Sequence, residues 1–143
     1  MRFILDQWYF PGSPEEALSP FIVQNTGWSF VKDHGKLGLV PEGVNSTMIL
    51  EFHSTTHPIH SVTVLTMKSY GDRQADSYVR VQTFELQRNL EMKSIASIDI
   101  LGYHDSEMSV SYKYSIPGVN ITHDNSLFLQ WSLLESQLQK SWG

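Results

Sequence analysis

The chain has 143 residues, of which 41% are hydrophobic and 12% aromatic, which suffices for one packed domain at residues 1–143. It contains no cysteine, which excludes disulfides, thiolate zinc sites and cysteine nucleophiles. Its formal net charge is -5 and its ten lysines and arginines are scattered, so no nucleic acid is expected as a partner. Any ligand is expected to be neutral or weakly polar.

No apolar run is long enough to cross a membrane, so no membrane insertion is expected. The N-terminal segment carries too little apolar length for a signal peptide. The chain begins within a predicted strand, Arg2–Leu5, and ends at Lys140–Gly143, which indicates a module excised from a longer chain. The sequons Asn45-Ser46-Thr47 and Asn120-Ile121-Thr122 favour a secreted or Golgi-luminal location, which otherwise stays open.

Alternation of apolar and polar residues predicts eight or nine short strands separated by turn signals. A proline-containing surface loop is expected at 7–20, with one short strand before it at Arg2–Leu5; Phe21–Val23, after the loop, is a candidate for another. The clearer predicted strands are Gly27–Lys32, Lys36–Val40, Met48–Phe52, Val62–Met67, Tyr78–Gln82, Ser94–Leu101, Met108–Ile116 and Leu127–Leu133. The first two of these flank Asp33-His34-Gly35, whose composition predicts a tight hairpin turn.

Residues Ser61–Thr83 contain two runs of β-formers joined by a polar turn at Tyr70–Ser77, and they predict a second hairpin. Apolar residues occupy both faces of the first run, which indicates a central strand covered on both sides. In the second run, Val79 and Val81 point to one face of the strand. The opposite, polar face then carries Tyr78, Arg80 and Gln82, which Thr66 and Lys68 would join if the hairpin pairs in simple register.

Only two segments gather helix formers. Glu85–Lys93 is too short for a stable isolated helix, so a loop or one helical turn is expected there, and Leu134–Trp142 fits either a short helix or a frayed end. The prediction is therefore an all-β fold: an antiparallel β-sandwich of jelly-roll type with at most short helical turns. A closed barrel is the alternative, and the strand order cannot be derived from periodicity.

Two polar clusters are candidate metal sites. The loop containing His53, His57 and His60 offers imidazoles, but its spacing fits no zinc motif and it holds no carboxylate, so whether it binds metal stays open. Asp72 and Asp76, in the Tyr70–Ser77 turn, fit a structural calcium ion, although aspartate in a turn also serves local hydrogen bonds. No other cofactor is expected.

No motif of catalysis is present. The chain has no Gly-x-Ser-x-Gly elbow to anchor a nucleophilic triad, and convergence of two carboxylates from different strands cannot be derived from one sequence. The chain is therefore expected not to be an enzyme, with a small hydrolase on a sandwich scaffold kept as an alternative.

Aromatic residues give the more useful functional signal. Those in phase with aliphatic residues are expected in the core: Trp28, Phe30, Phe52, Tyr112, Tyr114 and Trp131. Others lie in or beside turns, where packing alone explains a large ring less well: Trp8, Tyr9, Tyr70 and Tyr103. Rings beside guanidinium and amide groups suit stacking on sugars and hydrogen bonding to their hydroxyls. The predicted ligand-binding residues are Tyr70, Arg73, Tyr78, Arg80, Gln82 and Tyr103.

Three segments carry a family resemblance: Gly27–Val31 (GWSFV), Gly35–Val40 (GKLGLV) and Thr63–Gly71 (TVLTMKSYG). They resemble galactose-binding-like β-sandwich modules found beside secreted or Golgi-resident enzymes of plants and algae, in which a Gly-Lys-x-Gly and a Leu-x-x-(Lys/Arg)-Ser-Tyr segment recur. The resemblance covers about residues 26–134 and implies a jelly-roll accessory domain that binds glycans. It supplies no catalytic residue.

The leading hypothesis is a non-catalytic module that binds carbohydrate or assists a neighbouring carbohydrate-active domain. The first alternative is a structural or protein-interaction module that packs on a neighbouring domain of the parent chain, which an apolar patch holding Trp8, Tyr9 and Trp142 would favour. The hydrolase is the second alternative.

Overall fold

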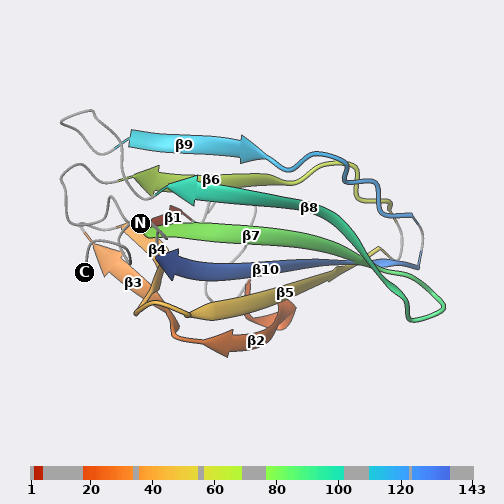
Figure 1. Cartoon of the computed structure of the whole chain (residues 1–143), viewed down its shortest axis with the longest axis horizontal. Coiled ribbons are helices and arrows are strands. Elements are labelled where there is room, and N and C mark those ends of the chain that lie inside the picture. The colour runs from red at the N-terminus through yellow and green to blue at the C-terminus, as the bar shows by residue number, and fades with distance from the viewer. Residues whose placement is uncertain are drawn as a thin grey trace.

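The computed structural model describes residues 2–4, 18–33, 36–54, 57–68, 77–101, 110–122 and 124–135. These residues form an all-β fold of two antiparallel sheets with one 3₁₀ turn at Ser19–Phe21, so the predicted fold class is confirmed (Figure 1). Sheet A has the order β3 (Trp28–Asp33), β4 (Lys36–Pro41), β1 (Arg2–Ile4), β6 (Thr63–Lys68) and β9 (Val110–Ser115). Sheet B has the order β2 (Ile22–Thr26), β5 (Thr47–His53), β10 (Ser126–Glu135), β7 (Ser77–Leu86) and β8 (Met92–Leu101).

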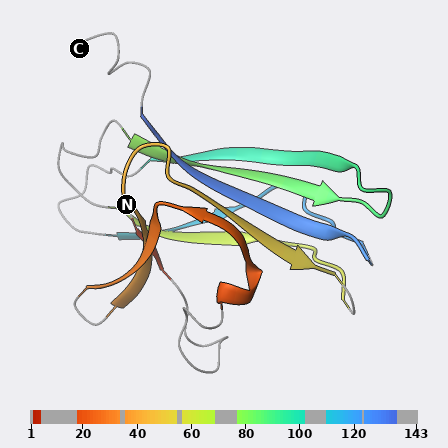
Figure 2. The same cartoon turned by 90° about the horizontal axis from the view of Figure 1, so that it is seen from below.

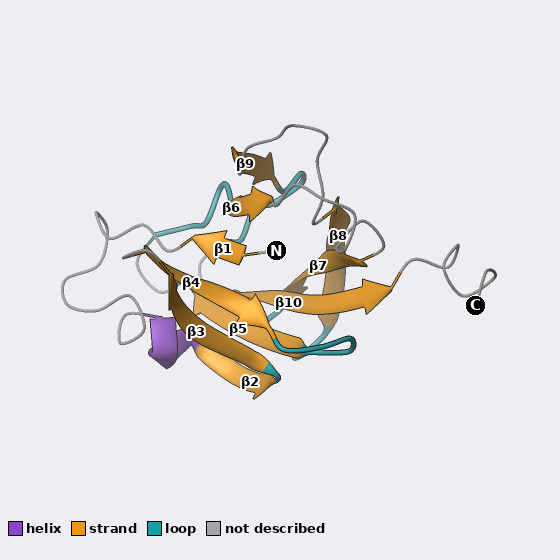
Figure 3. Ribbon diagram, turned by 90° about the vertical axis from the view of Figure 1, so that its left-hand side faces the viewer, coloured by secondary structure: helices purple, strands orange, loops and turns teal. Residues whose placement is uncertain are grey.

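The two sheets lie in separate layers, with β1, β6 and β9 in one and β5, β10 and β7 in the other (Figures 2 and 3). The chain passes repeatedly from one layer to the other: β5 is followed by β6 of the opposite sheet, β6 by β7, β8 by β9, and β9 by β10. This connectivity is compatible with the predicted sandwich of jelly-roll type. The three-residue strand β1 lies inside sheet A, between β4 and β6.

Period-two alternation explains how the layers meet. On β7, Val79, Val81 and Thr83 are completely buried, while the residues between them are only partly so. On β10, Leu127, Leu129 and Trp131 form the buried set. Because successive side chains of a strand point to opposite faces, these residues form the inner surface of sheet B.

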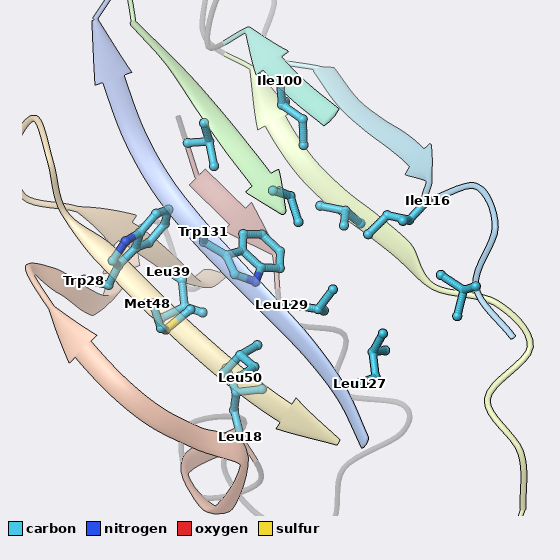
Figure 4. Packing of buried hydrophobic residues seen from close by; sticks show 14 of the residues in the cluster. Leu18, Trp28, Leu39, Met48, Leu50, Ile100, Ile116, Leu127, Leu129 and Trp131 are labelled. Atoms are coloured by element: carbon cyan, nitrogen blue, oxygen red, sulfur yellow. The ribbon is translucent and has the colours of Figure 1, made fainter. Parts of the chain in front are cut away.

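The inner surfaces of the two sheets share one hydrophobic core (Figure 4). Trp28 from β3 of sheet A meets Trp131 from β10 of sheet B edge to face, with ring centroids 6.4 Å apart and planes at 79°. This geometry suits the quadrupoles of two aromatic rings. The prediction that both tryptophans are core residues is confirmed, since their exposed fractions are 4% and 8%.

The corner before β3 holds Trp28 in place. The Asn25 side chain accepts a hydrogen bond from the backbone N–H of Trp28 at 3.1 Å and donates one to its carbonyl oxygen at 2.9 Å. Gly27 has a φ of 89°, and a β-carbon there would lie 2.4 Å from Oγ of Ser46. Glycine is therefore required where the chain passes from sheet B to sheet A.

The predicted hairpin over Ser61–Thr83 is wrong, because its two runs belong to different sheets. β6 pairs with β1 and β9, whereas β7 pairs with β8 and β10. Thr66 is completely buried on the inner side of sheet A, so it does not join the polar row of β7, and Lys68 lies in the same strand of the opposite sheet. Both runs have strand character, but periodicity carries no information about which strands pair.

Of two further hairpins, one was predicted from the sequence and one was not. Pairing of β3 with β4 confirms the predicted hairpin around Asp33-His34-Gly35. In place of the loop or helical turn expected over Glu85–Lys93, β7 continues to Leu86 and β8 begins at Met92, so these two strands form a hairpin with a short turn. The helix formers of this segment are overridden by pairing with neighbouring strands.

Removal of the Trp131 ring tests the shared core. Trp131→Ala should lower the free energy of unfolding by about 3–5 kcal/mol, since it deletes a large buried side chain and its contact with Trp28. Urea denaturation measures the change. Val23→Ala, at a side chain 52% exposed, is the control and should change stability by less than about 0.5 kcal/mol. If Trp131→Ala lowered the free energy of unfolding no more than Val23→Ala does, the placement of Trp131 in a core shared by the two sheets would be contradicted.

The turn between β7 and β8 contains a residue with a left-handed backbone, and the cost of that conformation can be tested. Leu90 has a φ of 68° and is 80% exposed, and its N–H donates to the carbonyl oxygen of Gln87 at 2.9 Å. A left-handed backbone costs a residue with a β-carbon about 1–2 kcal/mol. Leu90→Gly should therefore raise the free energy of unfolding by about 0.5–1 kcal/mol, whereas Leu90→Ala, which keeps the β-carbon, should not. Equal stability of the two variants in thermal unfolding would count against a strained turn.

Candidate ligand-binding face

Three of the six predicted ligand-binding residues lie together on β7. Val79 and Val81 point into the core, so the residues that alternate with them project from the outer surface of sheet B. These outward residues are Tyr78, Arg80 and Gln82, as the alternation predicts. That they bind a ligand stays a prediction. The remaining three, Tyr70, Arg73 and Tyr103, lie outside the described residues.

Arg80 is held by its neighbours on the outer surface. Its Nε donates a hydrogen bond to Oδ1 of Asp99 at 2.8 Å, and its Nη2 donates to Oδ2 at 3.2 Å. The guanidinium carbon also lies 5.7 Å from the centre of the Tyr78 ring, within range of a cation–π contact. The two side chains of the ion pair are 38% and 47% exposed, so a ligand can reach both.

The ion pair fixes the charge state of this position. The hydrogen bonds that Arg80 donates to Asp99, and then the negative charge of Asp99, raise the pKa of Arg80 above its ordinary value, so the guanidinium stays charged at any physiological pH. Asp99 compensates that charge, and the pair is locally neutral. A guanidinium has more N–H donors than the two bonds to Asp99 use, so Arg80 keeps donors for a ligand.

The strand register extends this position into rows that cross sheet B, because residues directly opposite each other share a face. The arginine row, in order from β2 to β8, consists of Thr26, Thr47, Ser132, Arg80 and Asp99. The adjacent glutamine row consists of Gln24, Ile49, Gln130, Gln82 and Ser97. We call the outward surface of sheet B that carries these rows the outer face. Both rows are dominated by uncharged hydrogen-bonding side chains.

An aromatic pair borders the glutamine row. Phe84 on β7 and Phe128 on β10 are directly opposite each other, and both are partly buried. Glu51 on β5 is opposite Phe128 on its other side. The outer face therefore combines apolar rings with amides, hydroxyls and a guanidinium.

A serine and a histidine meet at the far end of the outer face. Nδ1 of His53 lies 2.8 Å from Oγ of Ser126, and the two residues are opposite each other on β5 and β10. A serine beside a histidine is what nucleophilic catalysis requires. Ser126, however, is only 4% exposed, so its hydroxyl is covered, and the pair acts as a cross-strand hydrogen bond between β5 and β10.

Of the two candidate metal sites, only the histidine loop has its candidate ligands within the part of the chain that the structure describes. Within the described ranges, no group of three or more His, Asp or Glu side chains is arranged to hold a metal ion. His57 and His60 are exposed, and the carbonyl oxygen of His57 accepts a hydrogen bond from Ser54. Asp72 and Asp76, the predicted calcium ligands, lie outside the described residues.

Both sequon asparagines are at exposed positions. Asn45 occupies the turn between β4 and β5 with a φ of 71°, and Asn120 precedes Ile121, which is completely buried. Each asparagine side chain is thus accessible on the folded domain. A secreted or Golgi-luminal location stays a prediction.

Comparison with known proteins gives no family for the chain: no protein-family model matches it, and no curated protein does. The resemblance to galactose-binding-like modules therefore stays a prediction. In the part of the chain that the structure describes, no helix is long and apolar enough to cross a membrane.

Several residues of the outer face are not among the predicted ligand-binding residues. Asp99, Gln130, Phe84 and Phe128 join Arg80 and Gln82 only through the pairing of β7 with β8 and β10. Alternation in each strand indicates which residues point outward, and it places Asp99 and Gln130 correctly. It does not indicate which strand lies beside which, so the arginine and glutamine rows could not be predicted from the sequence.

A double-mutant cycle on Arg80 and Asp99 tests whether the pair is a local feature of the surface. Because both side chains are partly exposed, the coupling free energy from Arg80→Ala, Asp99→Ala and the double variant should be about 0.2–1 kcal/mol and should fall as salt is added. Urea denaturation gives the four stabilities. A coupling well above this range would mean that the pair is part of the folding core and that its variants cannot be used to test binding alone.

Proposed function

We propose that this domain is a non-catalytic carbohydrate-binding module and that its sugar site is the outer face of sheet B around Arg80. The observation that carries the proposal is the Arg80 position itself. Its guanidinium is fixed by Asp99 and by the Tyr78 ring, is locally neutralised, and stays accessible beside the amides of the glutamine row.

The chemistry of these groups matches that of a sugar. A hydroxyl both donates and accepts hydrogen bonds, and an amide such as Gln82 or Gln130 offers both roles from one side chain. A carboxylate and a guanidinium held together can engage two neighbouring hydroxyls with charge-assisted bonds, which are stronger than neutral ones. The rings of Phe84 and Phe128 can cover the apolar C–H face of a sugar. The negative net charge of the chain favours a neutral ligand over an anionic one.

The resemblance of Gly27–Val31, Gly35–Val40 and Thr63–Gly71 to galactose-binding-like modules adds to this proposal, since it implies an accessory domain that binds glycans. The covered Ser126 hydroxyl argues against nucleophilic hydrolysis by the pair of Ser126 and His53.

Exposed apolar residues along β8 and its turn favour a second candidate. Leu90 is 80% exposed, Met92 52% and Leu101 54%. Apolar side chains at the edge strand of a sheet suit contact with another protein surface. This candidate function is docking on a neighbouring domain of the parent chain.

Saccharide binding by variants of the outer face tests the proposal. The domain is first applied to a glycan array, and the best ligand is then titrated by calorimetry. Arg80→Ala should weaken binding about tenfold or more, since it removes a charged donor, and Gln82→Ala should weaken it several-fold. Lys113→Ala removes a positive charge from an exposed position on β9 of the opposite sheet and should bind like the native domain.

The stability of each variant is measured alongside, so that a loss of binding is not confused with unfolding. A native domain that binds no saccharide on the array or at millimolar concentration in solution would contradict the proposal, as would normal binding by Arg80→Ala and Gln82→Ala together.

A further inference from the structure

We infer that the outer face accommodates a linear, uncharged oligosaccharide segment that lies across the strands of sheet B, along the arginine and glutamine rows. This inference rests on the proposed function and goes further, because it gives the length, the direction and the charge of the ligand.

The direction follows from the strand register. Polar outward residues occur in both rows on four of the five strands, and in the arginine row on all five, including the edge strands β2 and β8. Along β7, in contrast, the outward polar run is limited to Tyr78, Arg80 and Gln82. The outward residues that follow are Phe84 and Leu86. The longest continuous line of hydrogen-bonding side chains therefore runs perpendicular to the strands.

The length follows from the spacing of strands. Neighbouring strands lie about 4.8 Å apart, so five strands span about 19 Å. One strand spacing is close to the length of one hexose unit in an extended chain. Each strand can then offer one or two hydrogen-bonding side chains to each sugar, and the rows accommodate about four or five units. A single terminal sugar would leave most of either row unused.

The absence of net charge follows from the composition of the rows. Arg80 and Asp99 form an ion pair with each other, and the other members of both rows are uncharged. The nearest additional charge on the central strands is Glu51, which lies in the next row beside Phe128 and is negative. An anionic chain would thus find no uncompensated positive charge in the rows and would lie near a carboxylate. Uncharged polyhydroxylated chains fit this surface.

The polar groups of the glutamine row are available to such a chain. Among the described residues, the Gln82 and Gln130 amides form no hydrogen bond within the protein, while Arg80 two positions along is fixed. Both residues are partly buried, so part of each side chain is already shielded from water before a ligand arrives. The Phe84 and Phe128 rings lie along the same side of the row and can contact the C–H faces of consecutive sugars.

Titration with linear oligomers of glucose, mannose, xylose and galactose, each from the monosaccharide to the hexasaccharide, tests the inference on the intact chain. For the series that binds, the dissociation constant should fall with each added unit up to the tetra- or pentasaccharide and then stay level. Oligomers of galacturonic acid should bind more weakly than galactose oligomers of equal length, because they add a negative charge to every unit.

A variant at the end of the glutamine row separates a chain from a local site. Gln24 lies on edge strand β2, three strands away from Gln82. Gln24→Ala should weaken the hexasaccharide several-fold and the disaccharide much less, since a short ligand centred on Arg80 and Gln82 does not reach β2. Val23→Ala, at the neighbouring residue of the same strand, is the matched control and should bind every oligomer like the native domain.

The outcomes separate this inference from the proposed function. Equal affinity for monosaccharide and hexasaccharide, with both still weakened by Arg80→Ala, would overturn the extended chain and leave a carbohydrate-binding module. Tighter binding of the galacturonic acid series would overturn the uncharged ligand in the same way. If no saccharide of any length binds, both the inference and the proposed function fail.

Discussion

The edge-to-face contact between Trp28 and Trp131 is the interaction on which the arrangement of this domain depends, because it joins the two sheets through the centre of one core. Trp131 lies on β10, which pairs along its whole length with β7 and over seven residues with β5. When Trp131 faces inward, period two requires Gln130 and Ser132 to face outward. A shift of one residue would bury these polar groups and expose the leucines of β10, so hydrophobic burial determines the composition of the outer face.

The same constraint separates the residues of the outer face from those of the core. Its side chains stand on strands whose opposite surfaces are buried, so their backbone positions are rigid. Its polar groups contribute little to stability, since an exposed ion pair such as Arg80 with Asp99 is worth about 0.2–1 kcal/mol. Outward residues can then be substituted at little cost in stability, while Val79, Val81 and Trp131 maintain the fold.

The sequence predicted the faces of the strands well and their neighbours poorly. Alternation in Tyr78–Gln82 and Leu127–Leu133 indicated correctly which residues point outward, because burial of one face is a local pattern. The hairpin inferred over Ser61–Thr83 failed, since β6 and β7 find their partners in opposite sheets, and pairing is a long-range property. The hairpin of β7 with β8 was missed because the helix formers of Glu85–Lys93 obscured two strand ends. The pairing of Arg80 with Asp99 was therefore not derivable.

Mapping of the bound ligand by NMR tests the central claim most directly, namely that the outer face of sheet B is the binding surface. The backbone amides are assigned, and their chemical shifts are followed while a linear hexasaccharide that binds in calorimetry is added. Perturbations should concentrate on β7 and β10 around Arg80, Gln82 and Gln130 and extend across β5 and β8. Perturbations confined to sheet A or to the segments that connect the strands, with β7 and β10 unchanged, would contradict the account.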